Sequence, residues 1–399
     1  MAVTQTPAAS PVVRRSGWLP TLFIGTFSVA CTEFVPVGLL PEIVDDLHIT
    51  AGSAGQLVTV NALALAVGAP LLAAIFARAD RRRVLAAALA VFAIGHIVAG
   101  LAPNYPVLLA SRLISGATMG LYLATALATG VRLAEEPRRA RTIATIVAGI
   151  STATAFGVPA STVLGQSLGW RLALGGLAVP AVLALALNMA VLPSLAGDET
   201  HSPIKRFTAL KSRPVVIALA AIVVFWGATF TVYTYLTPLL QSRAGFTDSA
   251  ITGVLFMAGL CAIVGNIFGG WLADIRPHWA LVGTATATTV AILFTLPATT
   301  STTGAVALVA MWQLAAWSFV PAAQSGLYRV AGTGGEFALS FAVSGFNIGI
   351  VVGAGLGGSA LDLAGLSAIA TLGGALSVTA LVLVLALVLH ISRTPAHPL

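Results

Sequence analysis

Two charged residues lie deep within apolar stretches of the sequence. Glu33 stands in the run VACTEFVPVG (29–38), and no other charged residue occurs from Trp18 to Pro41. Arg112 stands in a later apolar run, at a similar distance from that run's end. If both runs are helices, a rise of about 1.5 Å per residue puts the two charges at similar depth. The residue types therefore suggest an ion pair or a proton-exchanging acid.

A carboxylate in such surroundings has two interpretations. In the structural one, Glu33 and Arg112 form a fixed pair, or Arg112 bonds backbone carbonyls. In the functional one, Glu33 takes up and releases a proton, because apolar burial disfavours its charged form and a nearby arginine favours it. His96 could relay protons in the same way, or it could be a packing residue.

The composition indicates a membrane protein. Of the 399 residues, 58% are hydrophobic and 8% are charged, whereas soluble domains have about 25% charged residues. A membrane helix needs about 20 apolar residues. Twelve apolar spans run over 18–40, 53–76, 84–102, 106–131, 142–164, 171–192, 214–240, 249–272, 279–296, 304–327, 337–359 and 367–391. Their length favours helices over barrel strands, so we expect an all-α integral membrane protein of twelve transmembrane helices.

The basic residues set the expected orientation. With the N-terminus in the cytoplasm, all 20 Lys and Arg residues except Arg112, Arg171 and Arg243 fall on the inner side, as the positive-inside rule requires. Both termini would be cytoplasmic in a multi-pass plasma-membrane protein, and no cleavable signal peptide is expected before Trp18. This asymmetry explains the net charge of +7. The expected neighbour is anionic membrane lipid, and no nucleic-acid partner is expected.

The longest polar connection, 193–213, separates six spans from six. Three pairs of glycines recur in corresponding spans at nearly one spacing: Gly149 with Gly345, Gly157 with Gly353, and Gly68 with Gly265. Such repetition is typical of transporters built from internal repeats. The sequence thus predicts two pseudo-symmetric six-helix bundles, over 1–192 and 214–399, joined by a cytoplasmic linker.

Other polar or aromatic side chains could line a cavity or only pack helices together. They are Asn61, Met119, Tyr122, Tyr233, Tyr235, Gln313, Gln324 and Asn347. A further set of small residues and one proline could allow tight packing or a flexing point. It consists of Gly149, Gly157, Pro159 and Gly165 in GISTATAFGVPASTVLG (149–165), with Gly345 and Gly353 in the eleventh span.

The sequence lacks the motifs of several kinds of enzyme and cofactor site. The sequence contains no P-loop, no H-E-x-x-H and no set of metal ligands within the spans. Its two cysteines, Cys31 and Cys261, lie in apolar runs and read as packing residues. GAGLGG (353–358) lies in an apolar helix rather than after a strand, so it does not indicate a dinucleotide site. We expect no cofactor, no metal and no enzyme.

Together these residues resemble the major facilitator superfamily, specifically its twelve-helix drug–proton antiporters. TEFVPVGLLPEIVDDL (32–47) resembles the first-helix signature with Glu33 as its membrane acid, and RLISGATMG (112–120) resembles the fourth-helix motif with Arg112 as its arginine. The segment 149–165 resembles the fifth-helix antiporter motif, and GFNIGIVVGAGLGG (345–358) echoes it. VYTYLTPLL (232–240) and GNIFGGWLAD (265–274) are similar to exporters of arabinose, chloramphenicol and nucleosides.

One loop departs from the superfamily's pattern. The connection between helices two and three usually reads like G-x-L-A-D-R-x-G-R-R, but here it is GAPLLAAIFARADRRRVL (68–85). Ala77 stands where Asp274 stands in the second half, so the usual aspartate is missing or displaced to Asp80. The expected inner-loop residues are Arg81, Arg82, Arg83 and Asp274.

The resemblance implies helices one, four, seven and ten around a central cavity, and alternating access by rocking of the halves. We expect a monomeric, proton-coupled exporter of small molecules such as drugs, sugars or related metabolites. The alternatives are a sugar or nucleoside uptake symporter or facilitator, and a non-transporting membrane sensor or enzyme.

Overall fold

A computed structural model describes residues 17–135, 138–197, 212–331 and 335–393. Every regular element in these ranges is a helix, which confirms the expected all-α class. Most of the predicted linker (193–213), namely residues 198–211, is outside the described residues.

The first half begins with a span that is broken into three pieces. They are α1 (Trp18–Ala30), α2 (Val35–Gly38) and α3 (Leu40–Leu47). The next three spans are the single helices α4 (Ala51–Ile75), α5 (Arg81–Gly100) and α6 (Tyr105–Leu133). The fifth span combines α7 (Arg139–Thr152), a π-helical turn (Ala153–Gly157) and α8 (Val158–Leu168), and the sixth combines α9 (Trp170–Gly176) and α10 (Ala178–Val191).

The second half also begins with a broken span, α11 (Arg213–Tyr233) and α12 (Leu236–Ala244). It continues with α13 (Asp248–Ile275), α14 (Pro277–Leu293), the short α15 (Thr295–Ala298), α16 (Thr302–Ala331), α17 (Gly335–Ala364) and α18 (Leu366–Arg393). Among the described residues, ten helices are long and apolar enough to cross a membrane. The first and ninth predicted spans are shorter because α1 has 13 residues and α14 has 17.

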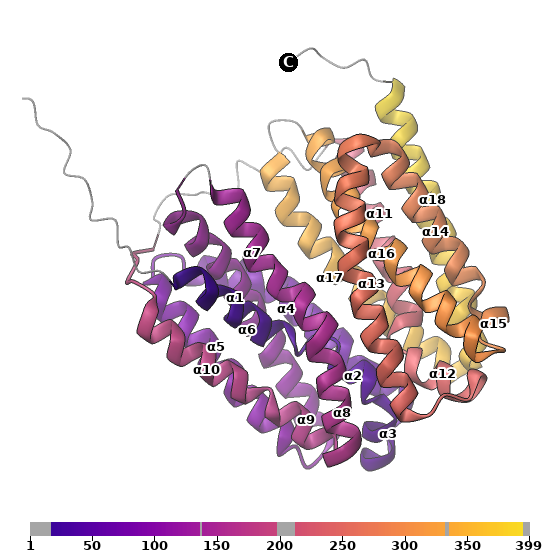
Figure 1. The fold of residues 1–399 in the computed structure, drawn as a ribbon, viewed down its shortest axis with the longest axis horizontal. Coiled ribbons are helices and arrows are strands. Elements are labelled where there is room, and N and C mark those ends of the chain that lie inside the picture. Colours follow the sequence, from indigo (N-terminus) through magenta and orange to yellow (C-terminus); the bar gives the residue numbers. More distant parts are fainter. Residues whose placement is uncertain (1–16, 136–137, 198–211, 332–334, 394–399) are drawn as a thin grey trace, which may run out of the picture.

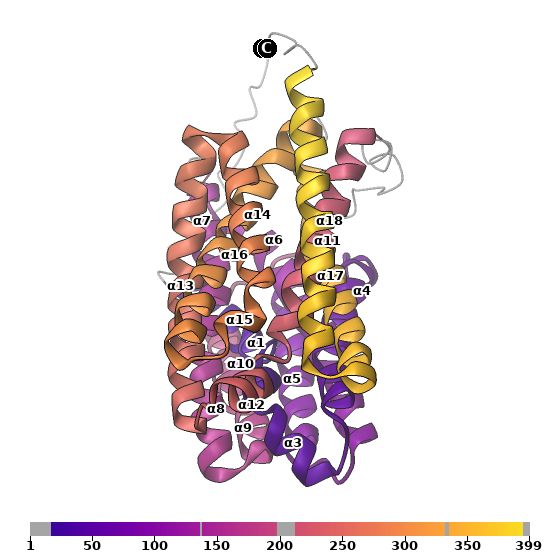
Figure 2. The same cartoon turned by 90° about the vertical axis from the view of Figure 1, so that its right-hand side faces the viewer.

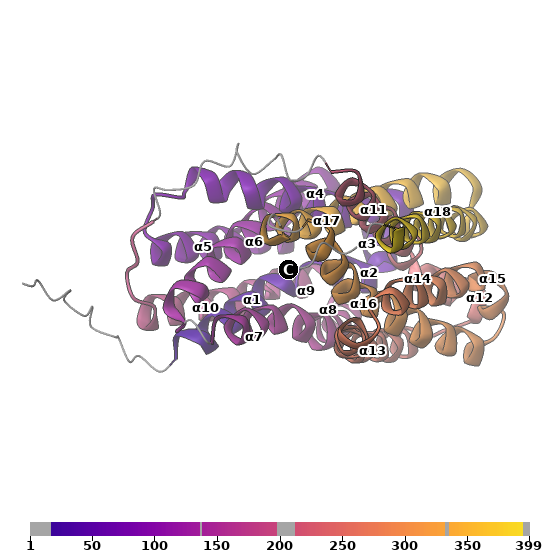
Figure 3. The ribbon, with the colours of Figure 1, turned by 90° about the horizontal axis from the view of Figure 1, so that it is seen from above.

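The two sets of helices form two bundles that lean against each other (Figure 1). The bundles diverge toward the end where α7 begins and α18 ends, and they converge toward the end that carries α2, α3, α8 and α12. Figure 2 shows α3 and α9 at that converging end, opposite the end of α18. Seen from the diverging end, the two bundles lie side by side, with α17 near their junction (Figure 3).

Glycines let the helices of each bundle approach closely in the same way in both halves. A Cβ on Gly149 of α7 would lie 2.9 Å from the carbonyl of Phe23 on α1. A Cβ on Gly353 of α17 would lie 2.3 Å from the carbonyl of Gly227 on α11. The fifth span thus packs on the first, and the eleventh packs on the seventh, as an internal repeat predicts.

Candidate functional site

A break in the first span holds Glu33 between two helices. α1 ends at Ala30 and α2 begins at Val35. Pro36 has no N–H, so it cannot bond the carbonyl of Thr32 four residues earlier. The carbonyl of Thr32 accepts a 2.8 Å hydrogen bond from Nη2 of Arg112 instead. The proline therefore frees the acceptor that a buried arginine uses.

Arg112 is fixed by three oxygen atoms. Its side chain, on α6, is 1% exposed. Nη1 donates to the hydroxyl of Thr32 at 2.5 Å, and Nε donates to the carbonyl of Leu57 on α4 at 3.3 Å. Among the described residues, no ion pair within 4.0 Å joins Arg112 to Glu33. The structure thus shows an arginine bound to carbonyls and a hydroxyl rather than to the carboxylate.

Glu33 lines a cavity of about 130 Å³ between the two halves. Its side chain is 9% exposed, and its carboxylate has no hydrogen-bond partner among the residues that the structure describes. The other lining residues of the first half are Phe34, Leu65, Met119, Leu123 and Ile150. Those of the second half are Trp226, Phe230, Trp317, Val320, Val343, Phe346, Asn347 and Ile350.

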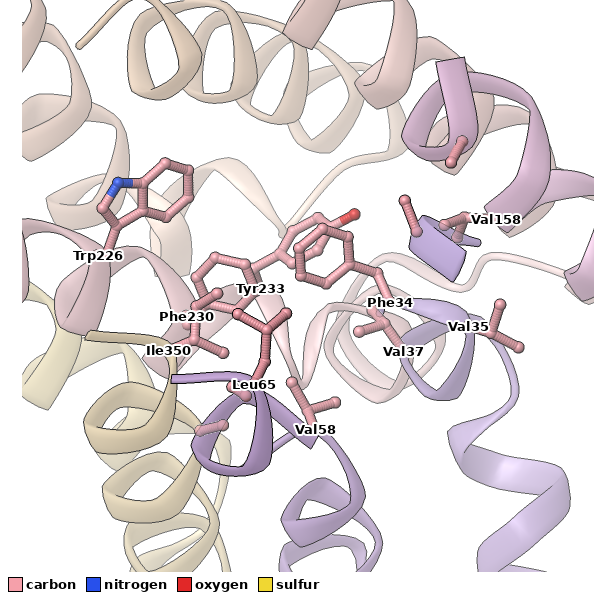
Figure 4. Packing of buried hydrophobic residues seen from close by; sticks show 14 of the residues in the cluster. Phe34, Val35, Val37, Val58, Leu65, Val158, Trp226, Phe230, Tyr233 and Ile350 are labelled. Atoms are coloured by element: carbon pink, nitrogen blue, oxygen red, sulfur yellow. The ribbon is translucent and has the colours of Figure 1, made fainter. Parts of the chain in front are cut away.

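Aromatic rings form much of the cavity wall. The ring centroids of Phe34 and Phe230 lie 5.3 Å apart, and those of Trp226 and Trp317 lie 5.4 Å apart. Figure 4 shows Phe34 from one half beside Phe230 and Tyr233 from the other. Glu33 is the charged residue of this wall, and Asn347 is its amide. A pocket of this kind suits a largely apolar small molecule with few polar groups.

Two of the eight predicted cavity residues, Met119 and Asn347, line this cavity. The Asn347 amide donates to the carbonyl of Val343 at 3.0 Å, and its Oδ1 has no partner within the described ranges. Gln313 lies behind the wall and accepts a 3.1 Å hydrogen bond from the indole of Trp317. It thereby orients a lining ring without lining the cavity itself.

The other five predicted cavity residues do not line the cavity. Asn61 accepts a hydrogen bond from Ser115 at 3.2 Å, and the Tyr235 hydroxyl donates to the carbonyl of Ala354 at 2.8 Å. Tyr122 is buried against Gly25. The remaining two are Tyr233, whose ring packs on Phe34, and Gln324, which is half-buried on α16.

The sequence-based prediction missed Thr32 and the aromatic residues that line the cavity, which are Phe34, Trp226, Phe230, Trp317 and Phe346. Thr32 stands four residues before Pro36, and that spacing marks a carbonyl without its helical donor. Trp226 and Phe230 stand four residues apart on one helix, and the predicted Tyr233 follows three residues later, which places all three on one face. Both patterns are present in the sequence, but a search for charged and polar residues within apolar spans does not find them.

His96 does not line the cavity. Its Nδ1 lies 2.9 Å from the carbonyl of Leu174 on α9, and its ring packs on Phe92 with centroids 4.5 Å apart. The side chain is 1% exposed. These contacts are those of a packing residue within the first half.

The predicted flexing residues lie at close helix contacts. Pro159 follows the π-helical turn, and it has no N–H for the carbonyl of Ala155. A Cβ on Gly259 of α13 would lie 2.5 Å from the Cα of Ala155, so this turn meets the other half. The other glycines of this group also pack closely against side chains: Gly157 against Cys31, Gly165 against Leu39 and Gly345 against Ile222.

The inner loop of the first half fastens α5 to the residues after α10. Asp80 caps α5 by accepting a 3.0 Å hydrogen bond from the N–H of Arg83, and it also accepts one from the hydroxyl of Ser194. Burial alone would raise the pKa of Asp80, but these hydrogen bonds lower it below its ordinary value. The N–H of Arg81 donates to the carbonyl of Leu195 at 2.9 Å. In the same region, Arg82 binds the carbonyl of Met189, whereas Asp274 is exposed at the end of α13.

Hydrogen bonds join the halves at their converging end. Asp362 of α17 accepts from the hydroxyl of Thr50 at 2.8 Å and from the N–H of Gly52 at 3.1 Å, both at the start of α4. The Thr237 hydroxyl donates to the carbonyl of Val37 at 2.7 Å. Gln166 of α8 donates to the carbonyl of Asp248 at 3.1 Å.

Comparison with known proteins agrees with this geometry. The model of a family described as the Major Facilitator Superfamily matches residues 22–336. The chain is 32% identical to the uncharacterized MFS-type transporter YbcL of Bacillus subtilis (strain 168), over 88% of this chain and 90% of the relative. It is also 32% identical to the inner membrane transport protein YdhP of Escherichia coli (strain K12), over 92% of this chain and 94% of that protein.

Solved structures share the fold. A bacterial homolog of the human lysosomal transporter Spinster, in an inward-facing and occupied conformation, superposes with a TM-score of 0.72 at 16% sequence identity. The match covers 97% of this chain and 100% of the other. The unoccupied inward-facing form gives a TM-score of 0.69.

Proposed function

The chain belongs to the Major Facilitator Superfamily and is a secondary transporter that works by alternating access, and we propose that it exports small, largely apolar molecules in exchange for protons. The chain is a multi-pass membrane protein and a transporter rather than an enzyme. One observation carries the proposal: Glu33 lines the cavity between the halves while Arg112 is bound elsewhere. A carboxylate without a fixed partner can gain and lose a proton.

The proposed cycle uses Glu33 as the proton carrier. When the cavity opens outward, a proton from outside binds Glu33 and the cargo leaves. The protein then reopens inward, releases the proton and accepts new cargo. A proton moving down the membrane potential supplies about 2.3 kcal/mol per 100 mV. The diverging end faces the cytoplasm in this proposal, which makes the structure an inward-facing state.

The cavity wall favours apolar cargo over sugars and nucleosides. A sugar needs partners for several hydroxyl groups, and each buried polar group without a partner costs about 1–3 kcal/mol. Among the described lining residues, only Glu33, Asn347 and the indoles of Trp226 and Trp317 carry polar side-chain atoms. Export rather than uptake rests on the resemblance of the segments at 32–47, 112–120 and 149–165 to antiporters.

The test replaces Glu33 with Gln in everted membrane vesicles that have an imposed proton gradient. The probes are ethidium, an apolar cation, and chloramphenicol, an uncharged molecule. We expect gradient-driven accumulation of at least one probe by the natural protein, and loss of that accumulation in Glu33→Gln. Glu42→Gln is the matched control, because Glu42 lies on α3 outside the cavity. Full gradient-driven transport by Glu33→Gln would exclude the proton role.

A further inference from the structure

We propose that Thr32 is a positioning residue that keeps Arg112 off the Glu33 carboxylate and thereby sets the pH at which Glu33 exchanges its proton. The inference rests on the proposed function of Glu33. It concerns the neighbour of the acid rather than the acid itself.

Two atoms of Thr32 bind two nitrogen atoms of one guanidinium group. The hydroxyl accepts from Nη1 at 2.5 Å, and the carbonyl accepts from Nη2 at 2.8 Å. On the opposite side, the carbonyl of Leu57 accepts from Nε at 3.3 Å. All three nitrogen atoms of Arg112 therefore have an oxygen partner, and the plane of the group is fixed.

The next residue in the chain offers a stronger acceptor. Hydrogen bonds between a guanidinium and a carboxylate are roughly twice as strong as those to neutral groups. Arg112 nevertheless binds Thr32 rather than Glu33. It can do so because Pro36 leaves the Thr32 carbonyl without a helical donor and because the threonine hydroxyl adds a second acceptor. Loss of the hydroxyl frees Nη1 to turn toward Glu33.

The groups around Glu33 make Arg112 the decisive neighbour. The cavity wall around Glu33 consists of apolar side chains such as Leu65 of α4, Ile150 of α7 and Val320 of α16, together with the aromatic rings of α11. From α17 it receives the uncharged amide of Asn347. Among the described residues, Arg112 on α6 is the charged group that interacts electrostatically with Glu33. His96 on α5 interacts in turn with Arg112. An arginine within about 4–6 Å stabilises the charged form of a carboxyl by about 1–3 pH units. A closer Arg112 must therefore move the titration of Glu33 to lower pH.

The experiment needs no cargo. Purified protein in lipid vesicles is titrated while the infrared absorption of protonated carboxyl groups is recorded, and subtraction of Glu33→Gln identifies the Glu33 band. We expect Thr32→Val to move the midpoint of that band by about one pH unit toward acid. Thr32→Ser keeps the hydroxyl and should titrate like the natural protein. Pro36→Ala is a second variant, because its new N–H competes for the Thr32 carbonyl, and it should shift the midpoint in the same direction.

The outcomes separate this inference from the proposed function. Unchanged midpoints in both Thr32→Val and Pro36→Ala, with a normal Glu33 band, would overturn the role of Thr32 alone. An equal shift in Thr32→Ser would do the same. A Glu33 band that does not titrate in any variant would overturn the proton role of Glu33 and the inference with it. Melting temperatures of all variants establish that they are folded.

Discussion

The carboxylate of Asp362 binds the main-chain N–H of Gly52 at 3.1 Å and so joins α17 of one half to the first turn of α4 of the other. The same carboxylate accepts a hydrogen bond from the Thr50 hydroxyl. A negative charge at a helix N-terminus is stabilised by the helix dipole. Because opening at the converging end must separate α4 from α17, this contact favours the closed state.

Asp362→Asn should open the converging end. Asparagine keeps one acceptor oxygen but loses the charge and the second acceptor. Hydrogen bonds to a charged group contribute about 1.5–3 kcal/mol when buried, and the exposure of Asp362 reduces that figure. We expect the ratio of open to closed molecules to rise about tenfold, equivalent to about 1.4 kcal/mol. The measurement is the distance distribution between spin labels at Ser167 and Ser249, in a variant without native cysteines.

Asp46→Asn is the matched control for this experiment. Asp46 also lies at the converging end, but it pairs with Arg171 of its own half at 2.5 Å. Its replacement should leave the label distances unchanged. Gly52→Ala should act like Asp362→Asn, because the new Cβ would lie 2.2 Å from Oδ2 of Asp362. Label distances that stay the same in both variants would show that the contact does not hold the end closed.

Arg112→Lys should destabilise the protein although the charge is kept. A lysine has one nitrogen atom and cannot reach the Thr32 hydroxyl, the Thr32 carbonyl and the Leu57 carbonyl together. The Thr32 carbonyl is then left without a partner, which costs about 1–3 kcal/mol, so the melting temperature in detergent should fall by several degrees. Arg243→Lys is the control: Arg243 also binds a hydroxyl and a carbonyl, but it is exposed. Equal effects of the two replacements would contradict the prediction.

Stability should depend on pH through Asp80. The hydrogen bonds of the folded protein lower the pKa of Asp80 against its burial, so the folded state holds the charged form more firmly than the unfolded chain. This contribution is present above the unfolded value of about 3.9 and is lost as the pH falls through the lower folded value. The melting temperature of Asp80→Asn should therefore lie below that of the natural protein at pH 7, by a small amount because the site is half exposed.

The difference between Asp80→Asn and the natural protein should shrink as the pH is lowered toward that range. Asp274→Asn serves as control, since Asp274 is exposed at the corresponding end of the second half. A difference for Asp80→Asn that is the same at neutral and acidic pH would mean that the charge of Asp80 is not involved.

The helices could be predicted from the sequence because lipid imposes one simple requirement. Backbone groups in a bilayer must bond within their own segment, so length and apolarity suffice to locate spans such as α4 and α13. The break at Cys31–Phe34 was not predicted, although Pro36 marks it. The sequence stays apolar through the break, so apolarity does not reveal it. The Thr32 carbonyl, which has no helical donor, accepts a hydrogen bond from Arg112 on another helix instead.

The cavity could be predicted only in part, because polarity is a poor guide to cavity exposure inside a membrane. Glu33, Met119 and Asn347 do line it. In contrast, the Tyr235 hydroxyl donates a hydrogen bond to the carbonyl of Ala354, and the amide oxygen of Asn61 accepts one from Ser115. Buried polar groups need partners, and neighbouring helices supply them. Which polar groups remain for a ligand depends on helix rotation, which the sequence pattern leaves open.

If Glu33 carries the proton, the one carboxylate among the described residues of the cavity wall limits how steep a gradient the transporter can build. If Glu33 is the carrier, one proton enters for each cargo molecule that leaves. An uncharged cargo is then driven by both the membrane potential and the pH difference. For a cargo with one positive charge, the two charges cancel, and each pH unit supports only about a tenfold concentration ratio. The charge of the cargo, rather than the affinity of the aromatic wall, would then decide how far export can proceed.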